Sequence, residues 1–530
     1  MDDAFLSRNF GKFLSISVWG VMIFIISTLF LVLEDTVKNK MLMKLKLNFV
    51  NKFIRKFYAL DLGFLQSKSV GENVYRLTNI DVQTDFVVEQ YPCLLADLLK
   101  LIIVLGVSLW VNWQMTVLLL LLAPLFLLQR FFLQKKLNPI YERLWESTAR
   151  LSKKIHEAFS RILVIKAFGL ETHKRHIYLK SLIENIRITI KSFRWSVVYS
   201  LNSSFLSKAV YGAVTLFGGW FIIKGKMSVG SYTAAMLYLM QLGSLLESLS
   251  YRFEHVAKEA VSLIKFLEIM DNQPGIKDLP GARSLGTVKG LIQFKNVTFG
   301  YQQNKLIFND LNLDIPSGSW IAITGPSGCG KSTLVNLILR FYEPSQGQIL
   351  LDKLDLKMIR LKDLRKSVAI AMQQPLLFDV SIKENISCGL RHITQEKIAE
   401  AAIITCLDDY IRELPQGYDT PIGEDAYLLS HGLKQRVALA RAIVNNPDLL
   451  ILDEAISSVD EFTADKILHN LKEKRRNLST IIISHRMSVV NAADRIFFLQ
   501  GNSLIAEGTP ADLASKDQSY QRFFKQSNLK

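Results

Sequence analysis

The chain has few cysteines for its length, and none of them forms a C-x-x-C pair. Its 530 residues contain four cysteines, at positions 93, 329, 388 and 406. This scattering argues against a disulfide framework and against a structural zinc site. No small-residue cleavage site follows the first apolar run, so the sequence gives no sign of a cleavable signal peptide.

Charged residues are also scarce. They make up 21% of the chain, whereas hydrophobic residues make up 49%, and the mean hydropathy is +0.20. A chain of this length and hydropathy is neither a single ordinary domain nor a soluble protein. The net charge of +16 fits either nucleic acid or cationic loops beside a membrane. The long apolar runs of the first half favour the membrane, and we expect no nucleic-acid partner.

Five apolar runs predict membrane spans, each of about the 20 residues that cross a bilayer. They lie near residues 13–33, 94–111, 115–133, 197–222 and 231–249. The short links at 112–114 and 224–230 predict tight hairpins, and the longer segments 38–89 and 134–195 predict cytoplasmic helical extensions. Basic residues follow the first run, so the positive-inside rule places the N-terminus outside and everything after about residue 254 in the cytoplasm.

Four charged residues lie in or at the ends of these spans. A charge inside a membrane is costly, so its side chain faces a water-filled path or a partner. Two interpretations remain open: contact with a transported substrate, strongest for Lys208, or snorkelling and interhelical ion pairs. The four are Asp97, Lys100, Lys208 and Glu247.

The second half begins with a phosphate-loop pattern. Residues 271–290 are rich in Gly, Pro and Asp and are interpreted as a linker. A buried strand at 320–324 is then followed by the loop GPSGCGKS at 325–332 and a helix at 333–341. This is G-x-x-x-x-G-K-[ST] in its strand–loop–helix setting. Glycines let backbone N–H groups surround a phosphate, and the helix N-terminus adds its positive dipole end. We expect ATP to bind Gly325, Pro326, Ser327, Gly328, Cys329, Gly330, Lys331, Ser332 and Thr333.

A second apolar strand, 449–452, ends in two carboxylates, Asp453 and Glu454. At the carboxyl end of a buried parallel strand, Asp453 can hold Mg²⁺ and Glu454 can polarise an attacking water. In the phosphate loop, Lys331 supplies charge to the β- and γ-phosphates and the Ser332 hydroxyl can ligate Mg²⁺. The alternative, an acidic surface pair, is weaker beside a phosphate loop.

With these motifs in order, nearly the whole chain resembles a half-transporter of the ABC exporter superfamily. The resemblance implies an α-helical transmembrane domain in residues 1–270, followed by an α/β P-loop ABC nucleotide-binding domain in residues 291–530. It implies an ATPase coupled to transmembrane transport, with ATP and Mg²⁺ as cofactors. Its partners would be a second half-transporter, in a homodimer or heterodimer, membrane lipid and an unidentified substrate.

The resemblance assigns further roles. Tyr301 matches the aromatic residue that stacks on adenine, and His485 matches the histidine that contacts the γ-phosphate. Gln373 matches the loop glutamine that senses Mg²⁺, with Gln374 as the neighbouring alternative. Asp460 closes the sequence SSVD, which matches the loop that crosses the dimer interface. The implied catalytic set is Glu454, His485 and Gln373, and the implied Mg²⁺ set is Ser332, Gln373 and Asp453. Residues 420–424 resemble the acidic cross-talk segment, and 60–85 and 164–172 resemble the two intracellular loops with coupling helices.

The sequence departs from the family pattern at its signature. Residues 429–433 read LSHGL, where the family has L-S-G-G-Q. Ser430 and Gly432 match, whereas His431 and Leu433 replace a glycine and a glutamine. The motif acts on the partner's ATP, and we expect a weakened site because a side chain fills a position that needs bare backbone. The family also has six spans, so a five-span form and a truncated start both stay open.

The leading hypothesis is ATP-dependent export by alternating access, driven by dimerisation of the nucleotide-binding domains and by hydrolysis. One alternative is a catalytically asymmetric subunit of a heterodimeric exporter, since the altered signature accompanies an intact Glu454 and His485. Another is a nucleotide-gated channel or regulatory subunit, in which binding matters more than turnover. We expect a multi-pass protein of the cell membrane with its ATP-binding domain in the cytoplasm.

Overall fold

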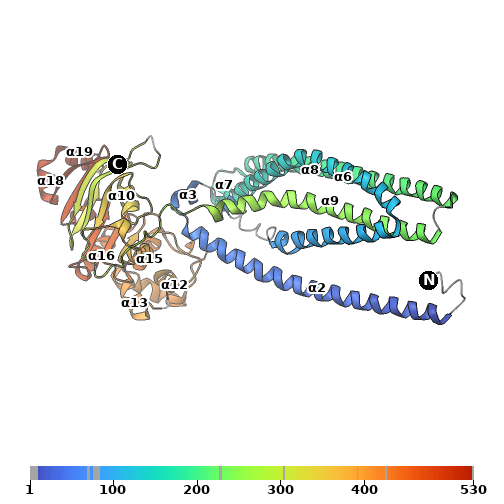
Figure 1. Cartoon of the computed structure of the whole chain (residues 1–530). Coiled ribbons are helices and arrows are strands. Elements are labelled where there is room, and N and C mark those ends of the chain that lie inside the picture. Colours follow the sequence, from blue (N-terminus) through green and yellow to red (C-terminus); the bar gives the residue numbers. More distant parts are fainter. Residues whose placement is uncertain are drawn as a thin grey trace. The chain divides into compact units, whose positions relative to one another are not determined.

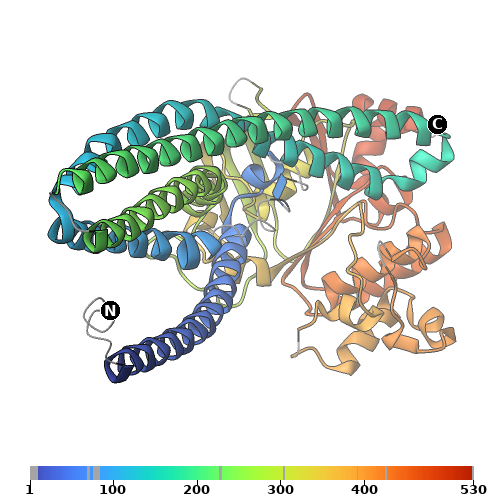
Figure 2. The same ribbon diagram turned by 90° about the vertical axis from the view of Figure 1, so that its right-hand side faces the viewer.

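The structure is a computed structural model that describes residues 10–67, 72–73, 75, 84–225, 229–302, 305–390, 392–423 and 426–527. The chain divides into two compact units, Met1–Gln273 and Pro274–Lys530. The described part of the first unit is helical, and the second combines helices with two sheets (Figures 1 and 2). The predicted fold class, a helical transmembrane region before an α/β nucleotide-binding domain, is therefore confirmed.

Long helices dominate the first unit. Three helices of its described residues are apolar and long enough to cross a membrane, in Ser17–Ala59, Phe86–Trp110 and Glu171–Ile223. They overlap the predicted spans near 13–33, 94–111 and 197–222, and the five-span count stays a prediction. The elements are α2 (Phe10–Ala59), α3 (Leu62–Ser67), the π-helical turn η1 (Phe86–Gln90), α6 (Tyr91–Ser160), α7 (Ile162–Ala167), α8 (Glu171–Ile223) and α9 (Val229–Asp271).

The 70-residue helix α6 reverses direction. Near its start, Oδ2 of Asp97 accepts a hydrogen bond from Nε of Arg252 on α9 at 2.7 Å. Further on, the ring of Trp145 lies 5.8 Å from Nζ of Lys265, also on α9. In straight helices Asp97 and Trp145 would lie about 72 Å apart, but their partners on α9 lie only about 20 Å apart. Helix α6 must therefore run away from Asp97 and return, and equal rise per residue in both directions places the reversal near residue 114. Figures 1 and 2 show the ribbon of α6 turning back on itself. The predicted link at 112–114 lies in this stretch, with helical backbone throughout.

The second unit is built around a six-stranded sheet of order β10-β9-β3-β8-β7-β6, parallel except for β10. All residues of β3 and β8 are buried, which explains why these strands are continuous apolar runs. An antiparallel sheet of order β2-β1-β4-β5 accompanies it. The strands are β1 (Ile292–Phe299), β2 (Phe308–Ile315), β3 (Trp320–Thr324), β4 (Gln346–Leu351), β5 (Leu354–Asp355), β6 (Val368–Ala371), β7 (Leu449–Asp453), β8 (Ser479–Ile483), β9 (Arg495–Gln500) and β10 (Ser503–Gly508).

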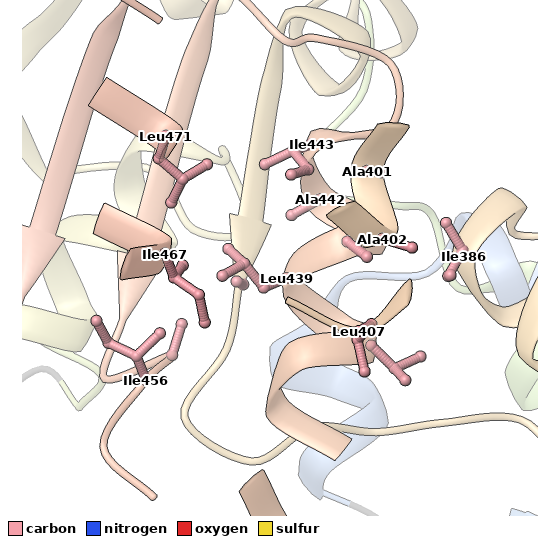
Figure 3. Packing of buried hydrophobic residues seen from close by; sticks show 14 of the residues in the cluster. Ile386, Ala401, Ala402, Leu407, Leu439, Ala442, Ile443, Ile456, Ile467 and Leu471 are labelled. Carbon is pink, nitrogen blue, oxygen red and sulfur yellow. The ribbon is translucent and has the colours of Figure 1, made fainter. Parts of the chain in front are cut away.

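Apolar packing fixes the helices that carry the site. In Figure 3, Leu439 and Ile443 of α15 and Ile467 and Leu471 of α16 belong to one buried cluster. Full burial of each such side chain stabilises the fold by roughly 1.5–3 kcal/mol. The helices are α10 (Lys331–Ile338), α11 (Leu361–Ser367), α12 (Ile382–Ser387), α13 (Gln395–Ile404), α14 (Asp408–Glu413), α15 (His431–Ile443), α16 (Glu461–Lys474), α17 (Met487–Asn491), α18 (Pro510–Lys516) and α19 (Gln518–Ser527), with 3₁₀ turns η2 (Leu356–Met358) and η3 (Gly417–Asp419).

Most of the predicted linker is attached to the second unit. The buried Arg340 donates from Nη2 to the carbonyl of Lys277 at 3.1 Å. The backbone N–H of Leu361 donates to Oδ1 of Asp278 at 2.8 Å. Residues 274–290 therefore belong to the second unit, although they form almost no regular structure.

Candidate active site

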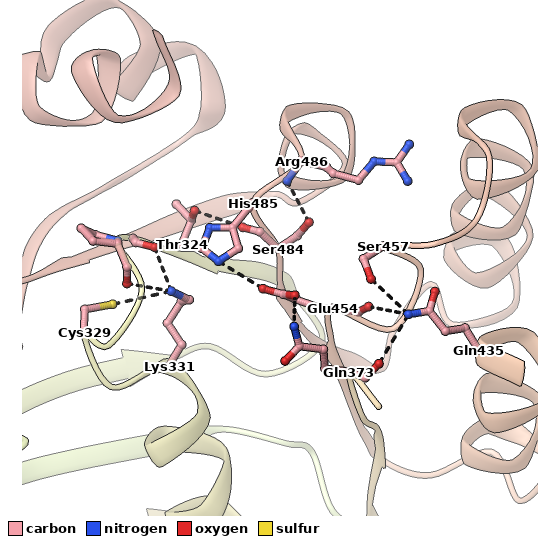
Figure 4. A network of polar contacts seen from close by, with 12 residues as sticks. Thr324, Cys329, Lys331, Gln373, Gln435, Glu454, Ser457, Ser484, His485 and Arg486 are labelled. Carbon is pink, nitrogen blue, oxygen red and sulfur yellow. Dashed lines mark hydrogen bonds and ion pairs between the residues drawn. The ribbon is translucent and has the colours of Figure 1, made fainter. Parts of the chain in front are cut away.

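Four loops meet at one edge of the six-stranded sheet. They follow β3, β8, β7 and β6, which are neighbours and run parallel, so their carboxyl ends lie at the same edge. In chain order the loops carry Lys331, Gln373, Glu454 and His485, and Figure 4 shows these side chains together. Residues 31 to 154 positions apart in the sequence are thus brought into one cluster by the strand order.

The phosphate loop, residues 325–332, depends on glycine for its path. Gly330 has φ +103° at the N-cap of α10, and a Cβ there would lie 2.5 Å from the ring of Phe308. A Cβ on Gly325 would lie 2.1 Å from the carbonyl oxygen of Leu499. Helix α10 begins at Lys331, two residues earlier than the sequence predicted, because left-handed Gly330 turns the chain directly into the helix.

Lys331 points into the curve of this loop. Its side chain is buried, and Nζ donates to the carbonyl oxygens of Gly325 at 2.8 Å and Pro326 at 2.9 Å. Sγ of Cys329 lies 3.8 Å from the same Nζ. Because these hydrogen-bond partners are neutral, they do not neutralise the positive charge of Lys331, which can attract an anion such as a phosphate. Lys331 also lies at the N-terminus of α10, where anions bind favourably.

Asp453 lies at the end of β7, close to the phosphate loop. Burial raises the pKa of its carboxyl and the neighbouring charge of Glu454 adds to this, whereas Lys331 and a hydrogen bond from Ser332 act in the opposite direction. The raised pKa reflects mainly the removal of this carboxyl from solvent. Carboxylate and hydroxyl oxygens are the ligands that Mg²⁺ prefers, so this donor set fits that ion.

The carboxylate of Glu454 is held from two sides (Figure 4). Oε1 lies 3.1 Å from Nε2 of His485, and Oε2 accepts a hydrogen bond from Nε2 of Gln373 at 2.6 Å. Gln373 makes this contact, which distinguishes it from its neighbour Gln374. The backbone of Glu454 has φ +50°, a left-handed conformation that is uncommon for a residue with a Cβ, and its N–H donates to the carbonyl of Ile483 at 2.9 Å.

The surroundings of His485 favour its neutral form. Burial lowers the pKa of its imidazole and the positive charge of Lys331 lowers it further, while Glu454 raises it by a smaller amount. A neutral ring has one N–H, and a carboxylate can only accept a hydrogen bond. In the neutral ring, therefore, the N–H is at Nε2 and donates to Oε1 of Glu454. The neighbouring loop is anchored by Thr324, whose Oγ1 donates to the carbonyl of Ser484 at 3.1 Å.

Tyr301 lies beside the first turn of α10. Its hydroxyl donates to Oγ1 of Thr333 at 3.3 Å and accepts from Nδ2 of Asn336 at 3.0 Å. The rings of Phe299 and Tyr342 contact it edge-on, at centroid distances of 5.1 and 5.0 Å. Tyr301 remains 48% exposed, so part of this residue is accessible beside the first turn of α10.

The signature residues and Asp460 are not part of this cluster, and the side-chain hydrogen bonds of Ser430 and Asp460 are local. Oγ of Ser430 accepts from the N–H of Leu433 at 3.3 Å and so caps α15. Oδ1 of Asp460 accepts from the N–H of Thr463 at 2.9 Å, caps α16, and has its pKa lowered by that bond. His431 is exposed and is the first residue of α15. Both caps stand at helix N-termini, which favours negative charge nearby.

Three predicted segments are only partly described. In the cross-talk segment, Ile382 donates its N–H to the carbonyl of Thr420 at 3.1 Å, and Glu424 lies outside the described residues. In the first predicted intracellular loop, residues 68–71, 74 and 76–83 lie outside them too. The second loop is fully described, and it joins α7 to α8 through Gly169, which has φ +60°.

The sequence analysis missed Gln435 and Arg486. Gln435 is 1% exposed and hydrogen-bonds the loop after Glu454 (Figure 4). Arg486 donates from Nη1 to the carbonyls of Ile456 at 3.2 Å and Val459 at 2.9 Å. A signal for Gln435 was available, because it shares the apolar face of α15 with Leu439 at helical spacing.

Comparison with known proteins gives matches along almost the whole chain. The family model described as ABC transporter matches residues 308–457, and the model described as ABC transporter transmembrane region matches residues 1–246. A putative multidrug export ATP-binding/permease protein of Staphylococcus aureus is 30% identical over 94% of this chain and 86% of that protein. An ATP-dependent lipid A-core flippase of Desulfotalea psychrophila is 29% identical over 89% of this chain and 83% of that protein.

Among solved structures, one titled as a bacterial Atm1-family ABC exporter with ATP bound superimposes with a TM-score of 0.91. It is 25% identical and covers 99% of this chain and 93% of that chain. The likeness therefore extends over both units.

Proposed function

Because the chain belongs to the ABC transporter family, as a multi-pass membrane protein whose ATPase is coupled to export, we propose that it works by alternating access. In this proposal two ATP-binding domains, one from each of two half-transporters, close over ATP in the cytoplasm. ATP stabilises the closed pair and ADP with phosphate does not, so hydrolysis resets the cycle by differential binding.

One observation carries the proposal. The carboxylate of Glu454 is fixed between His485 and Gln373 at the sheet edge that holds the phosphate loop. This position suits a group that orients and polarises a water for attack on a γ-phosphate. The N–H of neutral His485, which donates to Glu454 here, would donate to the phosphate when ATP is bound, and Lys331 would supply positive charge. Tyr301 would stack on the adenine.

Mg²⁺ belongs to the proposal as a cofactor. Ser332, Asp453 and Gln373 would hold it, because hydroxyl, carboxylate and amide oxygens are ligands that Mg²⁺ accepts and Ser332 bonds Asp453 beside the phosphate loop. When bound, the ion would neutralise charge on the phosphates.

The test is ATP hydrolysis by the chain purified in lipid, with the variant Glu454→Gln. The amide keeps the shape of the side chain but cannot take a proton, so we expect kcat to fall at least about 100-fold while ATP binding is retained. A matched control is Glu473→Gln, a surface carboxylate of α16 that pairs with Arg476 at 3.5 Å. Hydrolysis by Glu454→Gln at the parent rate would refute the assignment.

A second candidate is supported by the signature. Exposed His431 opens α15, at the position where the family has glycine, while Glu454 and His485 are in place. This combination fits one subunit of a heterodimeric exporter, whose signature weakens the site formed on its partner. Size determination and mass spectrometry of the complex isolated from its own cells decide between the two. A second, different ABC chain at equal amount supports the heterodimer, and a dimer of this chain alone that hydrolyses ATP excludes it.

A further inference from the structure

The side chain of Gln435 contacts both the loop 457–460 and the backbone of the proposed catalytic residues. It lies one turn into α15, and its side chain is 1% exposed. Nε2 donates to Oγ of Ser457 at 3.0 Å, and Oε1 accepts from the backbone N–H of Ser458 at 2.9 Å. The two ends of one amide therefore hold two consecutive residues of the loop 457–460, of which Figure 4 shows the bond to Ser457.

The same amide reaches the backbone of the proposed catalytic residues. Nε2 lies 3.4 Å from the carbonyl oxygen of Glu454 and 3.5 Å from that of Gln373, both long contacts. The carbonyl of Glu454 also accepts from the N–H of Ser457 at 3.1 Å. A shift of the loop 457–460 is thus passed directly to the backbone that carries the Glu454 carboxylate.

The loop and the signature helix are packed closely enough to move together. A Cβ on Gly432 would lie 2.9 Å from the carbonyl oxygen of Ser458, so the first turn of α15 rests on the loop. On the other side Arg486, next to His485, holds the carbonyls of Ile456 and Val459. Close-packed elements with satisfied polar groups transmit displacement because they have little free space to absorb it.

We propose that Gln435 is a positioning residue that links the signature helix and the loop 457–460 to the carboxylate of Glu454. Rigid contact of Ser430 with a partner's ATP would then set the geometry of this chain's own hydrolytic group. The proposal rests on the function proposed above, and it adds that one ATP site adjusts the other through a single buried amide.

The alternative is that Gln435 only satisfies buried backbone groups and supports the fold. The control Ser479→Ala represents that case, because Ser479 is buried and its Oγ bonds Gly290 and the N–H of Gly318 away from the site. For Gln435→Ala we expect kcat for ATP to fall at least tenfold with KM changed less than twofold. Ser479→Ala should keep kcat within twofold of the parent. A parallel loss of kcat, ATP binding and melting temperature in both variants would overturn the proposal.

Coupling is tested by a double-mutant cycle. We expect Ser430→Ala to lower kcat about tenfold in the parent but less than twofold when Gln435 is already alanine. Two reductions that multiply would contradict the proposal. The parent and Glu454→Gln are measured in the same assay. If these two proteins are equally active, the proposed function is wrong. If Glu454→Gln is inactive but the kcat reductions of Ser430→Ala and Gln435→Ala multiply, only the proposed role of Gln435 is wrong.

Hydrogen exchange gives a second readout that needs no turnover. We expect ATP to protect the amides of residues 454–460 in the parent, and Gln435→Ala to lose most of that protection while the phosphate loop keeps its own. Equal protection of 454–460 in both proteins would overturn the proposal.

Discussion

Oε1 of Glu454 lies 3.1 Å from Nε2 of His485, so the proposed base and the proposed γ-phosphate ligand are in direct contact. They come from the ends of neighbouring strands β7 and β8, which pair in register from Leu449–Ser479 to Asp453–Ile483. Glu454 therefore acts to raise the pKa of His485, although burial and the charge of Lys331 lower it by more.

The first prediction concerns the pH dependence of stability. Burial and the charge of Lys331 lower the pKa of His485. Below its ordinary pKa near 6.5, the unfolded chain takes up a proton that the folded chain does not, so the free energy of unfolding falls as the pH falls. We expect the melting temperature of the parent to drop more between pH 6.5 and 5.5 than that of His485→Gln. The other histidines are common to both proteins, and equal slopes would contradict the prediction.

The second prediction compares two glycines of the phosphate loop. Both have positive φ, +103° at Gly330 and +83° at Gly328, but a Cβ has open space within 4 Å only at Gly328. We expect Gly328→Ala to cost about 1 kcal/mol of backbone strain. Gly330→Ala adds a clash with Phe308 and should cost about 3 kcal/mol. Thermal unfolding of the purified variants measures the loss of stability in each. Equal losses in the two variants would show that the clash with Phe308 is relieved, and would contradict the prediction.

The third prediction concerns the ion pair between α6 and α9. The side chain of Asp97 is 7% exposed and bonds Nε of Arg252 at 2.7 Å and Oγ of Ser248 at 2.8 Å. Asp97→Ala leaves Arg252 without its counter-charge and should cost about 2–3 kcal/mol, part of which the double variant with Arg252→Ala recovers. Lys100 lies 3.9 Å away and is 65% exposed, so Lys100→Ala is the control, with a cost below about 0.5 kcal/mol. Thermal unfolding in lipid is the measurement, and full additivity of the two alanines would argue against a coupled pair.

The fourth prediction returns to His431. The variant His431→Gly removes an exposed side chain from the first residue of α15, where helix N–H groups can donate hydrogen bonds to a phosphate. We expect kcat to rise about threefold to tenfold, equivalent to roughly 0.7–1.4 kcal/mol of barrier. Stability should fall by about 0.5–1 kcal/mol, because glycine is a poor helix former.

His469→Gly provides the matched control, since His469 is exposed on α16 away from the signature. It should show the loss of stability without the gain in rate. A slower His431→Gly enzyme would mean that the imidazole assists the signature instead of weakening it.

Local chemistry in the sequence was sufficient for much of the site. The spacing of Gly325, Gly330 and Lys331 within a strand–loop–helix pattern predicts the phosphate loop, since these requirements lie within a dozen residues. The apolar strand ending in Asp453 and Glu454 is equally local. The family resemblance placed them in one catalytic set with His485, and their meeting follows from the parallel strand order, which periodicity alone does not give.

Other features depend on long-range packing and could not be read locally. Helical spacing marks Gln435 as buried, but its partners lie 19 to 23 positions later, so no short motif reveals what the amide contacts. The choice of Gln373 over Gln374 depends on which amide faces Glu454, a matter of loop path. In α6, residues 112–114 were predicted to be a link between spans, yet their backbone stays helical where the chain reverses.

The attachment of residues 274–290 to the second unit shortens the free chain that connects the ATP-binding domain to α9. If all residues from Asp271 to Gly290 were free, the connection could extend over about 65 Å. Because Arg340 already holds the carbonyl of Lys277, the free length is only about 20 Å. A short connection transmits a displacement of the ATP-binding domain to α9 with little delay, because few free residues can absorb it. Lengthening it by a flexible insertion after Gln273 should therefore reduce transport per ATP hydrolysed before it reduces hydrolysis itself.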